Sequence, residues 1–259
     1  MSTQKAPHTI FIIPYRDRVN QRRQFISYFN DYIQKQDDLD GIKYYFIHQC
    51  DKRPFNRGAM KNIGILFFKN KFPQEWENIT FILHDIDCYP SPRISLPYKT
   101  TRGTVAHYYG TTNTLGGIVA IKGHDFMKIG GFPNFWGWGY EDNMLYQRCI
   151  HAGLMVDRTT FYPLTDIGHI IRLDIDDNIK SVSISEMKRF AYNSADSVNS
   201  ISNISSNQCD NMINILNFTV PYNPGKMVAY NTIDGVNRPD KYVSRRGVRK
   251  SGRQWDLLE

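Results

Sequence analysis

The chain has 259 residues, of which 41% are hydrophobic and 22% charged, and its formal net charge is +7. This length and composition are those of a globular protein with a sizeable core, and no apolar run reaches the roughly 20 residues that a membrane-spanning helix needs. The positive charge favours anionic partners, such as nucleotide phosphates, nucleic acid or anionic glycans, without choosing among them.

The first eight residues contain no apolar stretch of the kind found in signal peptides. We therefore expect a soluble, cytoplasmic protein with no membrane span, although a truncated piece of a longer anchored protein stays open. The four cysteines are widely spaced and form no Cys-x-x-Cys pair. This spacing favours reduced thiols over a disulfide framework or a zinc site.

Apolar β-branched runs alternate along the chain with segments of helical periodicity, which predicts an α/β fold. The predicted strands cover residues 9–14, 43–50, 80–83, 115–122 and 212–220. The predicted helices cover residues 21–36, 59–69, 124–129, 143–153 and 184–192. We expect one domain over residues 7–235, followed by a basic tail over residues 236–259.

Basic turns follow the first two predicted strands. Arg16 and Arg18 come after the first strand, and Arg57 lies in the turn after the second. Ligands of α/β folds bind at the carboxyl ends of the strands, so these arginines would face a phosphate or a uracil there. The alternative is that they are ordinary surface arginines of a loop.

Two aspartates, Asp85 and Asp87, follow the third predicted strand and are followed by a proline. In an extended segment, residues i and i+2 project to the same side, and two like charges so placed repel unless a cation lies between them. A divalent metal that carries a nucleotide diphosphate meets that need, since Mn²⁺ and Mg²⁺ prefer hard oxygen ligands. The Asp-x-Asp pattern by itself also occurs by chance in many loops.

The stretch over residues 130–142 is the most unusual part of the sequence. It places two tryptophans, two phenylalanines and a tyrosine among glycines and a proline, and it ends on Glu141 and Asp142. Aromatic rings suit the apolar face of a sugar and carboxylates suit its hydroxyls, while the start of a helix favours an ionised carboxylate, as a general base must be. The alternative is an aromatic turn that fills a core, with the two acids as ordinary first-turn residues.

Four of these stretches, in this order, resemble the β-1,4-galactosyltransferase family: Ile-Pro-Tyr-Arg-Asp-Arg at 13–18, Phe-Asn-Arg-Gly-Ala at 55–59, His-Asp-Ile-Asp at 84–87, and the aromatic stretch at 130–142. The motifs are most similar to those of the branch that transfers galactose to xylose on proteoglycan linkers. The resemblance implies a single-domain GT-A fold, with a mostly parallel, mixed central sheet flanked by helices. It also implies inverting transfer of galactose or a related hexose from a UDP-sugar to a glycan hydroxyl, with Mn²⁺ or Mg²⁺.

The resemblance also implies roles for particular residues. Those of the nucleotide-sugar site would be Pro14, Tyr15, Arg16, Arg18, Phe55, Arg57, Asp85, Thr114, Gly117 and Trp138. Those of the acceptor site would be Trp138, Glu141 and Asp142, with Asp142 as the catalytic base. The metal ligands would be Asp87 and His169.

The sequence departs from the family pattern in three places. Asn143 stands where the family usually has a further aspartate. His169 is the one candidate for a second metal ligand, because Ile171 and Leu173 occupy the positions where the family offers methionine or histidine. Thr114 falls near a position where the family commonly has a bulky tyrosine, so the donor pocket would admit donors other than UDP-galactose.

Two other functions stay open. One is a catalytically inactive relative that binds sugars through the aromatic stretch and has lost tight metal binding. The other is a polyanion or nucleic-acid binder that uses the basic tail, in which case binding weakens steeply with salt. Binding of a polyanion would leave the two acidic pairs, Asp85 with Asp87 and Glu141 with Asp142, without a role. We therefore expect that nucleic acid is not a partner.

Overall fold

The structure is a computed structural model, and it describes residues 5–33, 41–173, 179–191 and 196–232. The predicted basic tail, residues 236–259, lies outside the described residues. None of the helices in the described part is long and apolar enough to cross a membrane. All four cysteines are free thiols.

Within the described residues, nine strands form one mixed sheet. They are β1 (Thr9–Tyr15), β2 (Ile42–Gln49), β3 (Thr80–His84), β5 (Thr104–Gly110), β6 (Ile118–Lys122), β7 (Met155–Asp157), β8 (Tyr162–Pro163), β11 (Ser202–Cys209) and β12 (Met212–Thr219). Their order is β11-β12-β2-β1-β3-β6-β5-β7, with β8 also paired to β5. The central strands β12, β2, β1 and β3 are mutually parallel, whereas β6 runs antiparallel between β3 and β5. The expected mostly parallel, mixed sheet is confirmed.

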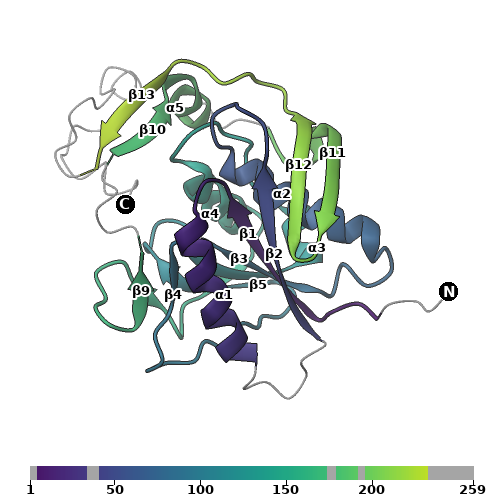
Figure 1. Ribbon diagram of the computed structural model, residues 1–259, viewed down its shortest axis with the longest axis vertical. Coiled ribbons are helices and arrows are strands. Elements are labelled where there is room, and N and C mark those ends of the chain that lie inside the picture. The colour runs from purple at the N-terminus through teal and green to yellow at the C-terminus, as the bar shows by residue number, and fades with distance from the viewer. Residues whose placement is uncertain (1–4, 34–40, 174–178, 192–195, 233–259) are drawn as a thin grey trace.

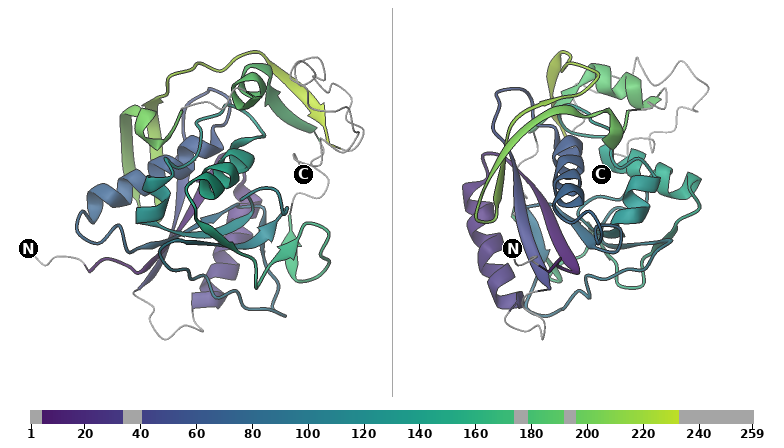
Figure 2. Two further views of the ribbon diagram at one scale, coloured as in Figure 1. Left: turned by 180° about the vertical axis from the view of Figure 1, so that it is seen from behind. Right: turned by 90° about the vertical axis from the view of Figure 1, so that its right-hand side faces the viewer.

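Helices cover both faces of this sheet (Figures 1 and 2). The helices of the described residues are α1 (Val19–Ile33), α2 (Arg57–Lys71), α3 (Gly123–Lys128), α4 (Glu141–His151), α5 (Ile184–Ala191), which lies beside the pair of strands at residues 179–183 and 227–231, and the short 3₁₀ helix η1 (Val198–Ser200). The strands carry apolar side chains on both faces, as buried parallel strands must. In β1, Phe11 packs with the phenylalanines of α1, and Ile12 packs with the apolar side of α2.

Two small ladders complete the described structure. The strand β4 (Cys88–Pro90) pairs antiparallel with β9 (Ile170–Arg172) just beyond the end of β3. The strand β10 (Ile179–Ser183) pairs antiparallel with β13 (Met227–Asn231), and it also forms a bridge from Val182 to Gly137 of the aromatic stretch. Two segments distant in the sequence therefore meet beside the carboxyl ends of the central strands.

The predicted elements are present, with boundaries shifted by a few residues. The strand expected from residue 115 begins only at Ile118. The reason is Gly117, whose φ of +73° breaks the strand and whose added Cβ would lie 2.4 Å from the carbonyl oxygen of Tyr109. The helix α4 ends at His151 with Ala152 as its C-cap, two residues before the predicted end, and Gly153 follows with a φ of +73°. The amides of Gly153 and Leu154 donate to the carbonyls of Ile150 and Cys149.

Gly64 allows α2 to cross the sheet closely, and this contact can be tested. A Cβ at this position would lie 2.9 Å from side-chain atoms of both Ile12 and Ile47. In an open helix, Gly→Ala stabilises by roughly 0.5–1 kcal/mol. Here we expect Gly64→Ala to lower the free energy of unfolding by about 1–3 kcal/mol, because the core has no room for the methyl group. Urea denaturation measures the change.

The matched control is Asn70→Ala, at an exposed position of the same helix. It should raise the free energy of unfolding by roughly a few tenths of a kcal/mol, through helix propensity alone. Equal stabilisation by both substitutions would contradict the close crossing.

Candidate active site

A cavity of about 480 Å³ opens at the carboxyl ends of β1, β2 and β3. Eight of its lining residues are ones that the sequence singled out: Pro14, Arg16, Arg18, Phe55, Arg57, Asp85, Asp87 and Trp138. The others are Lys52, Arg53, Pro54, Ile86, Gly137, Lys180 and Ser181. The position agrees with the rule that ligands of α/β sheets bind beyond the carboxyl ends of the strands.

The first two turns of α2 place two cations on one side of the helix. Asn56 caps this helix, and its side-chain oxygen accepts a hydrogen bond of 2.9 Å from the amide of Ala59. Arg57 and Lys61 are four residues apart and therefore lie above one another on the same face. Both point at carboxylates that come from other elements.

Arg57 joins the loop after β3 to the start of α4. Its Nη2 lies 2.7 Å from Oε1 of Glu141, and its Nη1 lies 3.4 Å from Oδ2 of Asp85. Burial by itself lowers the pKa of this guanidinium, but the surrounding carboxylates, Glu141 and Asp85 foremost, raise it well above its ordinary value. Arg57 is thus permanently charged.

Lys61 makes the same connection one helical turn deeper. Its side chain is only 1% exposed, and its Nζ lies 3.0 Å from Oδ1 of Asp85 and 3.7 Å from Oδ1 of Asp142. Burial by itself raises the pKa of Asp85, but the charges of Lys61 and Arg57 outweigh burial and hold it below its ordinary value. Asp85 is therefore an ionised partner of these two cations.

Asp142 lies in the first turn of α4, and its pKa is raised, whereas that of Asp85 is lowered. Burial raises its pKa to about 7, with Glu141 adding to the rise and Lys61 opposing it. The carboxylate packs against Gly116, where a Cβ would lie 2.4 Å from Oδ2 of Asp142. A carboxylate with such a pKa is suited to accept a proton near neutral pH.

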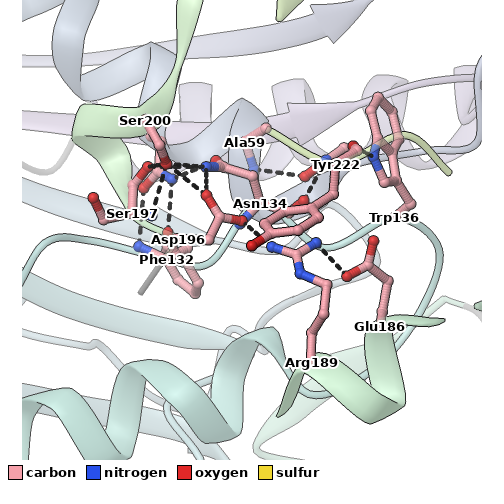
Figure 3. Close-up of polar contacts among 12 residues, drawn as sticks. Ala59, Phe132, Asn134, Trp136, Glu186, Arg189, Asp196, Ser197, Ser200 and Tyr222 are labelled. Carbon is pink, nitrogen blue, oxygen red and sulfur yellow. Dashed lines mark hydrogen bonds and ion pairs between the residues drawn. The ribbon is translucent and has the colours of Figure 1, made fainter. Parts of the chain in front are cut away.

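The aromatic stretch is anchored by a buried polar network (Figure 3). The backbone amide and side-chain amide of Asn134 donate to the two carboxylate oxygens of Asp196, at 2.8 and 2.6 Å. The side chains of Asn56 and Asn62, from the start of α2, donate to the two oxygens of Asn134 at 3.0 and 2.9 Å. The network ties the stretch to the helix that carries Arg57 and Lys61.

The same network continues to α5. Arg189 lies between Glu186 and Asp196, 2.5 Å from an oxygen of each, and its guanidinium stacks over the ring of Tyr222 (Figure 3). The later part of the chain thus supports the aromatic stretch through Arg189 of α5 and through Asp196.

The aromatic side chains of this stretch divide between the two roles considered from the sequence. Phe132, Phe135 and Trp136 are at most 2% exposed and belong to the core, as expected for an aromatic turn that fills a core. Trp136 donates from its indole to the carbonyl oxygen of Tyr222 at 2.7 Å. Trp138, by contrast, lines the cavity and stacks against Tyr230.

Comparison with known proteins shows two family profiles matching consecutive parts of the chain. One, described as the N-terminal region of glycosyl transferase group 7, matches residues 2–96, and one described as the N-terminal domain of galactosyltransferase matches residues 91–174. The chain belongs to the β-1,4-galactosyltransferase family.

Relatives within this family are distant. Human beta-1,4-galactosyltransferase 3 is 30% identical over 171 residues, which are 62% of this chain and 41% of that protein. Mouse beta-1,4-galactosyltransferase 1 is 29% identical over 176 residues, which are 59% of this chain and 39% of that protein. The chain thus spans about two fifths of the length of these curated relatives.

Solved structures confirm the GT-A-like fold. The catalytic domain of Drosophila beta1,4galactosyltransferase 7, in complex with xylobiose, matches with a TM-score of 0.59 and 19% identity over 82% of this chain and 94% of that one. A mutant of the same enzyme, in complex with manganese, UDP-Gal and xylobiose, matches with a TM-score of 0.60 and 19% identity over 81% of this chain and 94% of that one.

The two metal ligands implied by the family resemblance are not brought together. The amide of Leu173 donates to the carbonyl of Asp87 at 2.8 Å, whereas His169 pairs with Ser91 at the other end of the β4–β9 ladder. His169 is therefore four residues further along the strand, about 13 Å away at 3.3 Å per residue. Instead, Nδ1 of its ring forms a hydrogen bond of 2.9 Å with Oδ2 of Asp166.

The described residues offer Asp87 no partner side chain at the family position that could complete a site for a divalent metal. The described residues contain no group of three or more His, Cys, Asp or Glu side chains that could hold a metal ion. Leu173, directly opposite Asp87, has no side-chain atom that could serve as a ligand.

Three other residues expected at the donor site do not line the cavity. The ring of Tyr15 is 6% exposed and packs against Phe46 on the other face of the sheet. Thr114 is buried, with its hydroxyl bonded to that of Thr111 at 2.9 Å. Gly117 acts through its backbone, since its carbonyl accepts a hydrogen bond from the amide of Asp85.

Sequence reasoning missed Lys61 and Gly116. A signal for Lys61 was present, because a lysine in the middle of an otherwise apolar helical segment needs a buried partner. Gly116 carried no comparable signal. The contact that requires it comes from Asp142, 26 residues later in the sequence.

Lys61→Met tests whether this lysine compensates buried carboxylates. At neutral pH we expect it to lower the free energy of unfolding by about 3–5 kcal/mol, because Asp85 and Asp142 lose a buried partner. The pKa of Asp85 is depressed in the folded state, so its contribution is present above its ordinary pKa and is lost as the pH falls below about 4. The deficit measured by urea denaturation should therefore be smaller at pH 3.5 than at pH 7.

The control is Lys71→Met, at the exposed end of the same helix. It removes the same charge without uncovering a buried carboxylate and should change stability by less than about 0.5 kcal/mol. A deficit for Lys61→Met that does not change with pH would contradict the electrostatic role.

Proposed function

We propose that the protein is an inverting glycosyltransferase that moves galactose or a related hexose from a UDP-sugar to a hydroxyl group of a glycan. One observation carries this proposal. The ammonium group of Lys61 forms ion pairs with two carboxylates, those of Asp85 and Asp142. Asp85 lines the cavity, and Asp142 has a raised pKa. A carboxylate that can accept a proton is thereby held next to a basic cavity of nucleotide size in a member of this family.

The donor would occupy the cavity. Arg16 lies over the ring of Phe55, 5.4 Å from its centroid, and donates to the backbone carbonyl of Arg53 at 2.6 Å. This places a guanidinium and an aromatic face together, which suits the base and phosphates of UDP. Pro14 and Arg18 line the same end of the cavity. The Drosophila relative solved with UDP-Gal supports a UDP-sugar as the donor.

The reaction would be a direct displacement at the anomeric carbon. Asp142 takes the proton of the acceptor hydroxyl as its oxygen bonds to that carbon, and the bond to the UDP oxygen breaks. General base catalysis of this kind contributes about 10²–10⁴-fold. The charge that develops on the leaving UDP would be stabilised by the cations that line the cavity.

The acceptor would lie between Trp138 and the start of α4. Trp138 is held in place by its backbone amide, which donates to the carbonyl of Ser181 at 2.8 Å, and by stacking on Tyr230. An indole in this position orients a sugar ring and excludes water, which matters because hydrolysis of the donor competes with transfer. The xylobiose bound by the Drosophila relative supports a glycan as the acceptor.

Manganese is present in one of the solved relatives. Among the described residues, those across the ladder from Asp87 supply no second side-chain ligand, so the reaction described above includes no step through a metal.

Asp142→Asn tests the catalytic base. We expect transfer to fall by at least about 10²-fold, since the amide cannot accept the proton, while the affinity for UDP stays within about threefold. Transfer is measured with UDP-galactose and a xyloside, and UDP binding by calorimetry. Retained turnover would remove Asp142 as the base, and UDP binding without any transfer by the unaltered protein would favour the inactive sugar-binding alternative.

The control substitution is Asp157→Asn, at the end of β7, where the carboxylate accepts hydrogen bonds from the amide and the hydroxyl of Thr159. It removes a carboxylate far from the cavity and should leave the rate of transfer unchanged. A loss equal to that of Asp142→Asn would point to a general effect of charge.

The pH dependence of transfer gives a separate test. Because a general base acts in its deprotonated form, kcat/KM should rise with pH and level off above the pKa of Asp142, near 7. An unperturbed aspartate would give this limb near pH 4 instead. A rate that is flat between pH 5 and 8, as measured in a series of buffers of constant ionic strength, would contradict the assignment.

A further inference from the structure

We propose that His107 and Arg158 are positioning residues for the candidate base: together they fix the loop between β5 and β6, residues 111–117, against which Asp142 packs. The inference rests on the proposed function, since it concerns how the base of that reaction is held. Neither His107 nor Arg158 lines the cavity, so both act on Asp142 through the loop.

The loop contacts both acidic segments of the site. The amide of Leu115 donates a hydrogen bond of 3.1 Å to the carbonyl of Asp142. The carbonyl of Gly117 accepts one of 2.9 Å from the amide of Asp85. Between them, Gly116 lies against the carboxylate of Asp142, where a Cβ would come within 2.4 Å of Oδ2. The position of the loop therefore decides how Asp142 lies relative to Asp85 and how far water reaches its carboxylate.

His107, a buried residue of β5, holds the end of this loop through one side of its ring. Its Nε2 lies 2.9 Å from the carbonyl oxygen of Tyr109 and 3.1 Å from that of Gly116. Its Nδ1 lies 3.1 Å from Nε of Arg158. A guanidinium can only donate, so Nδ1 carries a lone pair and Nε2 carries the hydrogen that it donates to the carbonyls. The partners thus select one neutral tautomer, in which both nitrogens are satisfied.

The neutral form of His107 persists over the pH range in which the base titrates. Burial, and after it the charge of Arg158, lower the pKa of His107 to about 4, while its hydrogen bonds to the two carbonyls oppose the shift. His107 therefore stays uncharged near pH 7. Its contact with Gly116 does not change as Asp142 gains or loses a proton.

Arg158 fixes the middle of the loop and connects it to α4. Its Nη2 donates a hydrogen bond of 2.8 Å to the carbonyl of Thr112, and its guanidinium lies over the ring of Tyr146, 5.3 Å from the centroid. Tyr146 belongs to α4, the helix whose first turn contains Asp142. One guanidinium therefore joins His107, the loop and the helix of the base into a single unit.

Two substitutions of His107 test the positioning role. His107→Gln keeps a side chain that can donate to the carbonyls and accept from Arg158, whereas His107→Leu removes both functions. We expect kcat for transfer to fall by about tenfold or more in His107→Leu and by less than about threefold in His107→Gln, with the affinity for UDP unchanged in both. The matched control is His151→Leu, at the exposed end of α4, which should leave kcat unchanged.

The pH profile separates positioning from a general loss of stability. Among the described residues, the charged groups that face Asp142 are Lys61 and Arg57 of α2, Glu141 of α4 and Asp85 after β3. The substitutions of His107 leave these groups in place. Water that enters behind a loosened loop lowers the pKa of Asp142, because burial is the largest cause of its rise. The limb of kcat/KM near pH 7 should therefore move down by about one unit in His107→Leu and stay in place in His107→Gln.

The outcomes for the base and for its positioning differ. An unchanged kcat in His107→Leu, a fall without a shift of the limb, or equal losses in the two variants would overturn the inference and leave the proposed function standing. A profile of the unaltered protein that has no limb near pH 7 would remove Asp142 as the base, and this inference with it.

The tautomer of His107 gives a test that does not depend on the folding of any variant. Nitrogen-15 NMR of the unaltered chain should show a ring that is protonated at Nε2 alone from about pH 5.5 to about pH 8. A ring protonated at Nδ1, or at both nitrogens at neutral pH, would mean that Arg158 does not donate to it. Either result would overturn the inference.

Discussion

Two cations on one face of α2 hold the site together. Arg57 and Lys61 bind carboxylates that lie far apart in the sequence, Asp85 after β3 and the pair Glu141 and Asp142 at the start of α4. Buried carboxylates are costly unless they are paired, so the position of α2 determines where both acidic segments come to rest. The donor cavity and the candidate base are adjacent because they share these partners.

The rest of the fold keeps this helix in place. Gly64 lets α2 lie directly on β1 and β2, and the Asn134 network ties the start of the helix to the aromatic stretch. Arg189 and Asp196 extend the support from the later part of the chain. The packing explains how a stretch rich in glycine can present Trp138 to the cavity in one defined orientation, while its other large rings stay in the core.

The family resemblance and the geometry agree on the position of the site and disagree on the metal. Seven predicted donor-site residues and the predicted metal ligand Asp87 meet around one cavity, yet the ladder beside Asp87 carries Leu173 and Ile171 where ligands were expected. An Asp-x-Asp pattern thus identifies an acidic strand end and does not by itself identify a metal site. In this chain Asp85 neutralises the cations of α2, and Asp87 faces a cavity dominated by positive charge.

The order of strands and helices could be predicted from the sequence, because hydrophobic periodicity and turn residues are local properties. The acidic and aromatic stretches were recognisable for the same reason, since each motif lies within a few consecutive residues. Only the tertiary structure decided that Lys61 joins Asp85 to Asp142, that Gly116 makes room for Asp142, and that the rings of Phe132, Phe135 and Trp136 belong to the core. Those contacts join segments that are distant along the chain, and their burial and distances follow from how α2, α4 and the sheet pack, which no local pattern encodes.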